Sequence, residues 1–204
     1  MKKLLPILFA VAMFGQTTTV TLTGPATVPA GGNASVTVSM SGSSGQSVTA
    51  LQWSLTLPTG VTMGSPTAAS AWSTAGDAAT CNPANGTCII AGSQSVMADG
   101  VVATIPLTFG AAGSDPIPLG SLFAAAVIGG AGVNVNGMTP GPLYSIKVLS
   151  RCDVNSDGIV NAADIQLVIN AALGLGACPL SGTACNLVAV VNEVIAANGG
   201  ACKN

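Results

Sequence analysis

Residues 17–149 show the period-two alternation of apolar and polar side chains that is typical of half-buried β-strands. Segments 33–40 and 52–57 show it most regularly, since alternate residues of a strand point to opposite faces of a sheet. Further strands are expected at 88–91, 101–109, 117–128, 133–136 and 143–149. Turn residues such as Pro58-Thr59-Gly60 separate these segments. Many short strands without a helical period predict an antiparallel β-sandwich.

The hydrophobic period changes after residue 150. The apolar residues that recur there at helical spacing are Ile165, Val168, Ile169 and Leu173. This spacing predicts a helix, and Gly174 is a suitable C-terminal stop. Segment 190–199 has a matching pattern, whereas 144–149, before the first helix, alternates like a strand. A small α-helical unit therefore follows the sandwich.

Segment 153–164, just before the first helix, has the ligand spacing of a twelve-residue EF-hand calcium loop. The ligand candidates at positions 1, 3, 5, 7, 9 and 12 are Asp153, Asn155, Asp157, the carbonyl of Ile159, Asn161 and Asp164. Gly158 at position 6 permits the sharp turn, and the side chain of Ile159 is expected to pack inward. An all-oxygen ligand set favours calcium over magnesium. The alternative is an Asx-rich turn that caps a helix and binds no ion.

A calcium loop followed by a helix, without an entering helix, resembles the half EF-hand of a type I dockerin. The resemblance covers residues 151–204. Dockerins carry two such units, and the second would begin here near Cys178. Its loop keeps only Asn186, at position 9, as a ligand type, so one calcium ion is expected in total. Dockerins recognise partners largely through positions 10 and 11 of each unit, which implies the partner-binding residues Ala162, Ala163, Leu187 and Val188.

Two segments of the sandwich resemble cohesin modules. They are 50–62 and 100–109, the second of which is similar to the family's G-x-L-A-x-I-x-F strand. This resemblance spans about 17–149 and implies a mainly β chain: an antiparallel jelly-roll-like β-sandwich, followed by the small C-terminal α-helical dockerin-like calcium-binding domain. Trp53 is expected in the core. Trp72, in a loop of small polar residues, is the candidate exposed aromatic.

Residues 1–16 are expected to form a secretory signal. Lys2 and Lys3 precede an apolar segment, 4–14, that is too short to span a bilayer. The expected domains are therefore the signal at 1–16, the cohesin-like sandwich at 17–149 and the dockerin-like domain at 151–204. Secretion also makes disulfides possible for the six cysteines.

The cysteines predict three disulfides. Cys81 and Cys88 bracket a turn-rich loop and are expected to pair. For the other four, the preferred pairing is Cys152–Cys178 with Cys185–Cys202, which ties each loop–helix unit to itself. The rival is Cys152–Cys202 with Cys178–Cys185, because the termini of dockerins usually lie together. Zinc is disfavoured because paired C-x-x-C spacing and histidine are both missing.

The composition argues against several classes of function. Charged residues make up 6% of the chain, against roughly 25% in an average soluble protein. Asp77, Asp99 and Asp115 are the only acids of the sandwich; they are interpreted as solvated turn residues, and an enzyme is not expected. The five basic residues do not support nucleic-acid binding. Two Trp and one Tyr can hardly furnish an aromatic strip for carbohydrate.

These observations predict a secreted, non-catalytic assembly protein, stabilised by one calcium ion and located outside the cell or at its surface. Low charge and small side chains suit a surface that meets another copy. Self-association into an extracellular filament or surface layer, through the two modules, is therefore expected. The alternatives are an adaptor that docks on another protein's cohesin and a carbohydrate-binding module. No membrane span is expected after signal removal.

Overall fold

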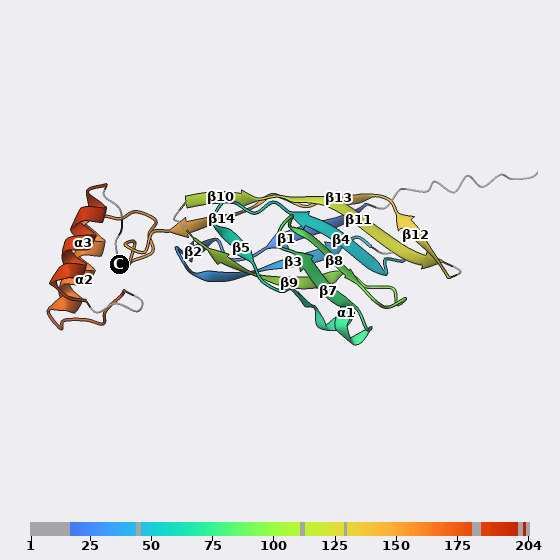
Figure 1. The fold of residues 1–204 in the computed structure, drawn as a ribbon, viewed down its shortest axis with the longest axis horizontal. Helices are drawn as coiled ribbons and strands as arrows, with labels where there is room; N and C mark the ends of the chain where they lie inside the picture. The colour runs from blue at the N-terminus through green and yellow to red at the C-terminus, as the bar shows by residue number, and fades with distance from the viewer. Residues whose placement is uncertain are drawn as a thin grey trace, which may run out of the picture.

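The computed structural model describes residues 17–43, 46–110, 113–128, 130–180, 185–199 and 202. The molecule is elongated, with a body of β-strands and a pair of helices at one end (Figure 1). The expected signal, 1–16, lies outside the described residues. Among the residues that are described, no helix is long and apolar enough to cross a bilayer.

The described strands of the body form three sheets. Their bounds are β1 Thr18–Thr23, β2 Thr27–Pro29, β3 Asn33–Ser41, β4 Ala50–Leu55, β5 Val61–Met63, β6 Thr67–Ala68, β7 Ala78–Asn82, β8 Thr87–Ala91, β9 Gly100–Phe109, β10 Gly113–Ile117, β11 Leu119–Ile128, β12 Ala131–Val135, β13 Met138–Pro140 and β14 Tyr144–Leu149. One large sheet has the order β13-β1-β3-β9-β5, with β6 also paired to β9, and the other has the order β12-β11-β4-β8-β7. A small sheet, β10-β14-β2, completes the body.

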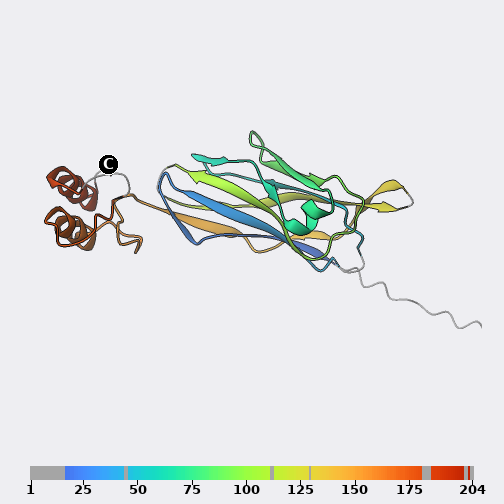
Figure 2. The ribbon, with the colours of Figure 1, turned by 90° about the horizontal axis from the view of Figure 1, so that it is seen from below.

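The strand pairing is mainly antiparallel, as the sequence predicted, with two exceptions. Strand β1 pairs with β13 in parallel, and β2 pairs with β14 in parallel. The first two strands of the chain thus join different sheets. Side-chain alternation could not predict this, because period two is common to parallel and antiparallel strands. The strands run along the length of the body in stacked layers (Figure 2).

The two large sheets enclose one hydrophobic core. One sheet contributes Val36 and Ile105, and the other contributes Leu51, Trp53 and Ile90, all at most 1% exposed. Along β4, buried residues alternate with half-buried ones. The expected core position of Trp53 is confirmed.

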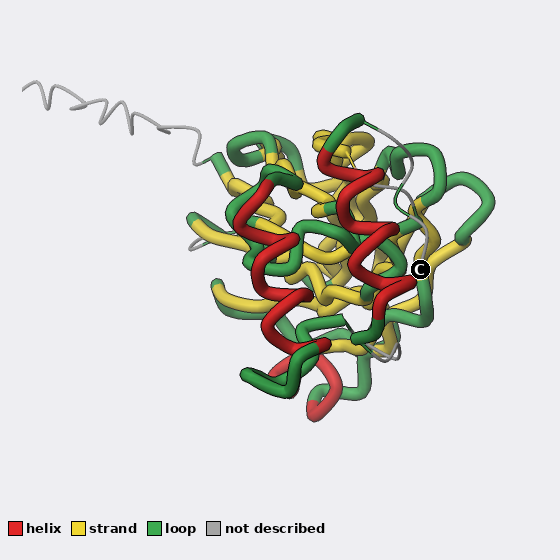
Figure 3. Tube along the Cα trace, turned by 90° about the vertical axis from the view of Figure 1, so that its left-hand side faces the viewer, coloured by secondary structure: helices red, strands yellow, loops and turns green. Residues whose placement is uncertain are grey.

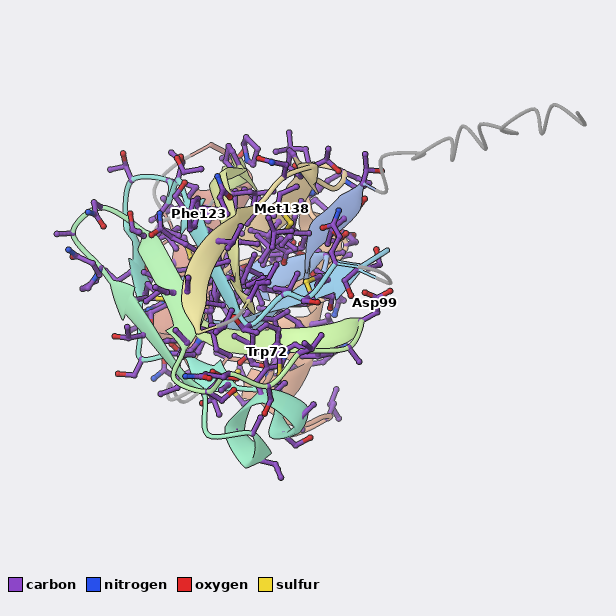
Figure 4. All side chains as sticks on the ribbon, turned by 90° about the vertical axis from the view of Figure 1, so that its right-hand side faces the viewer. Trp72, Asp99, Phe123 and Met138 are labelled. Carbon is purple, nitrogen blue, oxygen red and sulfur yellow. A yellow bond between two sulfur atoms is a disulfide. The ribbon has the colours of Figure 1, made fainter. Side chains whose placement is uncertain are left out.

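The expected exposure of Trp72 is wrong. Residues 70–74 form a short helix, α1 (Ser70–Thr74), and Trp72 is 1% exposed within the sandwich core. Its small polar neighbours make one helical turn, and that turn directs the single large side chain inward (Figure 4). The predicted strand 117–128 is also divided, at Pro118, between β10 and β11. Pro118, which has no N–H for a sheet ladder, lies at the break.

The C-terminal unit contains helices α2 (Ala162–Ala172) and α3 (Leu187–Ala197), which pack side by side (Figure 3). Its buried apolar cluster is small and consists of Val168, Leu180 and Ala189. The expected stop at Gly174 is confirmed: the residue has φ +75°, and its N–H donates to the carbonyl of Ala171. A left-handed glycine that closes a helix in this way satisfies otherwise unpaired carbonyls.

The structure contains three disulfides: Cys81–Cys88, Cys152–Cys202 and Cys178–Cys185. The first confirms the prediction, whereas the preferred pairing of the other four cysteines is wrong and the rival pairing is present. Cys178 and Cys185 both lie in the connection between α2 and α3, so their bridge closes that connection. Cys202, after α3, is joined to Cys152 at the start of the unit.

Candidate functional site

The loop 153–164 folds around its two outermost carboxylates. Asp153 and Asp164 are 6% and 0% exposed, whereas Asn155 and Asp157 are exposed. Asp164 accepts hydrogen bonds from the N–H groups of Asn155 (3.1 Å) and Asn161 (2.9 Å). Asp153 accepts one from the N–H of Gly158 through Oδ2 (2.8 Å). These bonds hold both ends of the loop together.

The turn at Gly158 favours glycine because of its positive φ, and the Lys147 side chain lies close to it. Its φ is +93°, and a Cβ at this position would lie 2.0 Å from Nζ of Lys147. Lys147, on β14, donates to the Gly158 carbonyl (3.1 Å). Hydrogen bonds from Asn155 and from the Ile159 N–H lower the pKa of Asp157, and the charge of Lys147 acts in the same direction. A residue of the sandwich therefore supports the loop.

Asp153 is the loop residue whose surroundings most clearly favour a bound cation. Its Oδ1 is buried and has no hydrogen-bond partner. A buried carboxylate oxygen without a partner is costly, and a bound cation removes that cost. Within the described residues, however, no three His, Cys, Asp or Glu side chains gather as a metal-binding group. A bound ion would therefore also need amide and carbonyl oxygens from the loop.

Asn161 shows that the capping role, the alternative to ion binding, is also present. Its Oδ1 accepts from the N–H of Ala163 (2.7 Å), and with Asp164 it forms a capping box at the start of α2. Capping does not exclude coordination, since each oxygen has two lone pairs. The expected inward packing of Ile159 is wrong: the side chain is 64% exposed, outside the small apolar cluster of this unit.

Glu193, on α3, is a candidate site residue that the sequence analysis missed. Its side chain is 1% exposed, and its Oε1 has no hydrogen-bond partner. Burial, together with the negative charges of Asp164 and Asp153, raises the pKa of Glu193 to about 7. Its burial could have been predicted from its position four residues after Ala189, which places both residues on the face of α3 that meets α2.

The second loop has no acid at the position equivalent to Asp164. Ala189 stands there and is buried. Asn186, its one remaining ligand type, caps α3 by accepting from the N–H groups of Val188 (3.0 Å) and Ala189 (3.1 Å). Part of this loop, 181–184, lies outside the described residues. The expectation of no second calcium ion stays a prediction.

The four predicted partner-binding residues are exposed and lie in the first turns of the two helices. Ala162 and Ala163 begin α2, and Leu187 and Val188 begin α3. Leu187 and Val188 are part of an apolar stripe at helical spacing on α3. We call this stripe the α3 face, and it consists of Leu187, Val188, Val191, Val194 and Ile195, each at least 40% exposed. Helix α3 therefore buries its only acid, whereas these five large apolar side chains are exposed to solvent.

The sandwich also has an uncharged surface, on the outer side of the sheet β12-β11-β4-β8-β7. Phe123 is 46% exposed there (Figure 4), and Ile89 is 39% exposed. Both lie opposite Gln52 in the strand register. None of these five strands contains an acidic or basic residue. We call this surface, represented by Phe123, Gln52 and Ile89, the sheet face.

Two acids of the sandwich have structural hydrogen bonds. Asp77 is 4% exposed and accepts from the N–H and hydroxyl of Ser93, at 2.7 and 2.9 Å, so its interpretation as a solvated turn residue is wrong. Asp99 is exposed and accepts from the N–H groups of Gly42 and Ser43, and hydrogen bonds from Ser43 lower its pKa. The side chain of Asp115 lies outside the described residues.

The sandwich has a cohesin-like β-sandwich fold. One similar solved structure is a non-cellulosomal cohesin from the archaeon Archaeoglobus fulgidus, with a TM-score of 0.52, 15% identity and coverage of 68% of this chain and 96% of that one. Another is the cohesin module of a family 33 glycoside hydrolase from Clostridium perfringens, with a TM-score of 0.52, 13% identity and coverage of 66% and 98%. No family model and no curated protein matches the chain. At these identities the likeness concerns the fold alone.

Proposed function

We propose that this chain is a secreted, non-catalytic assembly protein, in which the α3 face of one copy docks on the sheet face of the next. The observation that carries the proposal is the apolar stripe on α3, exposed on a helix whose buried side holds an acid. Burial of an apolar side chain contributes about 1.5–3 kcal/mol when complete. Five such side chains in one stripe are typical of an interface.

The sheet face supplies a complementary surface. Its strands are uncharged, and it is apolar at Phe123 and Ile89, so an apolar helix meets no unpaired charge on these strands. Two different faces on one chain make a heterologous contact, which propagates into a filament unless it closes into a ring. The cohesin-like fold of the sandwich supports a protein partner, since the two similar structures are themselves named cohesins.

Calcium and secretion are part of the same proposal. The loop 153–164 would bind one calcium ion and hold the start of α2, and thereby the helix pair, in its docking shape. The buried Oδ1 of Asp153 and the loop's ligand spacing support this. The three disulfides support an oxidising location outside the cell. The alternative partner is another protein's cohesin, and the α3 face would serve that contact equally.

Three lysine substitutions test the head-to-tail contact. Val191→Lys places a charge on the α3 face, and Phe123→Lys places one on the sheet face. Val101→Lys is the matched control, because Val101 is 46% exposed like Phe123 but lies on β9 of the other large sheet. Sedimentation velocity over a range of concentrations, in millimolar calcium, is expected to show assembly of wild type and control and monomers of the two face variants.

Mixing the two face variants gives the sharpest result. Each keeps one intact face, so the mixture is expected to form a dimer through one α3 face and one sheet face, without further growth. A Phe123→Lys variant that still dimerises alone would indicate an isologous contact between α3 faces and contradict the head-to-tail arrangement. A wild-type protein that stays monomeric at high concentration would favour the adaptor alternative and overturn self-association.

A further inference from the structure

The buried acid of α3 has no described partner that would justify its position. Glu193 is 1% exposed, and carboxylates are rarely buried unless they are paired or bind a cation. The basic residues in the described part of the chain are Lys147 and Arg151, and each donates elsewhere: Lys147 to the Gly158 carbonyl and Arg151 to the Ala30 carbonyl. The Oε1 atom of Glu193 remains buried and unpartnered.

The loop holds a second buried oxygen of the same kind. Oδ1 of Asp153 is also unpartnered, and Glu193 experiences the negative charges of Asp164 and Asp153. Val154, next to Asp153, packs against the apolar cluster that contains Ala189, one helical turn before Glu193, so the loop and this face of α3 are in contact. A divalent cation would attract both carboxylates, and the two unpartnered oxygens, Oε1 of Glu193 and Oδ1 of Asp153, could act as its ligands.

The loop itself has room for one more carboxylate. EF-hand loops usually close with a bidentate Glu at position 12, whereas this loop has the shorter Asp164. Both oxygens of Asp164 already accept backbone N–H bonds, from Asn155 and Asn161. Calcium takes six to eight oxygens, so a side chain from outside the loop can complete its shell.

We propose that Glu193 reaches across from the second unit and coordinates the calcium ion of loop 153–164 together with Asp153. The proposal rests on the calcium site proposed above. The second unit, whose own loop lacks the acids for a site, would then contribute its one acid to the first. In α2 the corresponding position, seven residues after its capping Asn161, is the buried apolar Val168. The calcium ion would thereby join α3 to the loop before α2.

Calcium titration of the full secreted chain, by calorimetry and by the calcium-induced shift in Tm, tests this. Glu193→Gln keeps the size of the side chain and removes its charge, and we expect it to raise the calcium Kd about tenfold or more. The calcium-induced shift in Tm should shrink in this variant. Asp99→Asn makes the same change of charge in the sandwich and should leave the calcium Kd unchanged.

The outcomes separate the two proposals. If wild type binds calcium, and Asp157→Ala weakens binding but Glu193→Gln does not, the loop site stands and the role of Glu193 is refuted. If wild type binds no calcium, the site itself is refuted. Lys203, which lies outside the described residues, provides a final control. A Lys203→Ala variant that destabilises the calcium-free protein, combined with an unchanged calcium Kd in Glu193→Gln, would assign Glu193 to an ion pair instead.

Discussion

Removal of the Cys152–Cys202 disulfide is expected to unfold the C-terminal unit while the sandwich remains folded. This bridge closes a loop of 50 residues, against 7 for Cys81–Cys88. In the chain-entropy model, the longer loop corresponds to about 4 kcal/mol of stabilisation and the shorter one to about 2.3 kcal/mol. The variant Cys152→Ala/Cys202→Ala therefore loses about 4 kcal/mol.

The size of that loss matters because the apolar core in the described part of the C-terminal unit is small. Its buried apolar cluster contains three residues, of which one is an alanine. Whole domains are stable by only about 5–15 kcal/mol, and a unit this small lies at the low end or below it. A loss of 4 kcal/mol is thus comparable with its entire stability.

Two spectroscopic signals separate the units in a urea titration. Both tryptophans, Trp53 and Trp72, lie in the sandwich core, so fluorescence reports the sandwich. Far-UV circular dichroism at 222 nm reports mainly α2 and α3. We expect the helical signal of the variant to be lost at low urea with the fluorescence midpoint unchanged, and Cys81→Ala/Cys88→Ala to shift fluorescence instead. Coincident shifts of both signals in the first variant would refute the reasoning.

Three further predictions concern single carboxylates. In calcium-free solution the C-terminal unit should lose stability, on the order of 1–3 kcal/mol, as the pH rises from about 4.5 to 7. The reason is that folded Glu193 keeps a proton that the unfolded chain releases. Urea titrations across this pH range check this prediction. Asp99→Ala should lower the free energy of unfolding by about 1 kcal/mol at neutral pH, since Gly42 and Ser43 lose an acceptor. That difference should shrink as the pH falls through the lowered pKa of Asp99, measured by thermal unfolding. Asp157→Ala should weaken calcium binding at least tenfold in calorimetry, and two equivalent ions per wild-type chain would contradict the single-site loop.

The sequence predicted half of the strands, namely β3, β4, β8, β9, β11, β12 and β14, because their alternation follows directly from burial on one side. It predicted the core position of Trp53 for the same reason, since its neighbours on β4 alternate. It failed for Trp72, where one helical turn, too short to show a period, decides the direction of the side chain. It did not predict that β1 pairs in parallel with β13 or that β2 pairs in parallel with β14, because alternation carries no information on strand direction.

The candidate site was predictable where the ligands are close in sequence and not where they are distant. The spacing from Asp153 to Asp164 is local, and the structure places those residues in one loop. Glu193 lies 29 positions beyond Asp164, on another helix, and only the packing of α3 on α2 brings it near. The pairing of Cys152 with Cys202 depends on the same packing.

The position of the Cys81–Cys88 bridge limits how copies of this chain can combine. Strand β7 is an edge of its sheet, and the two cysteines lie opposite each other in the register of β7 and β8. Edge strands are the elements that proteins most readily exchange with a neighbouring copy. A covalent link from β7 to β8 prevents β7 from separating from β8. Copies can therefore meet along this edge, but they cannot exchange β7 without β8.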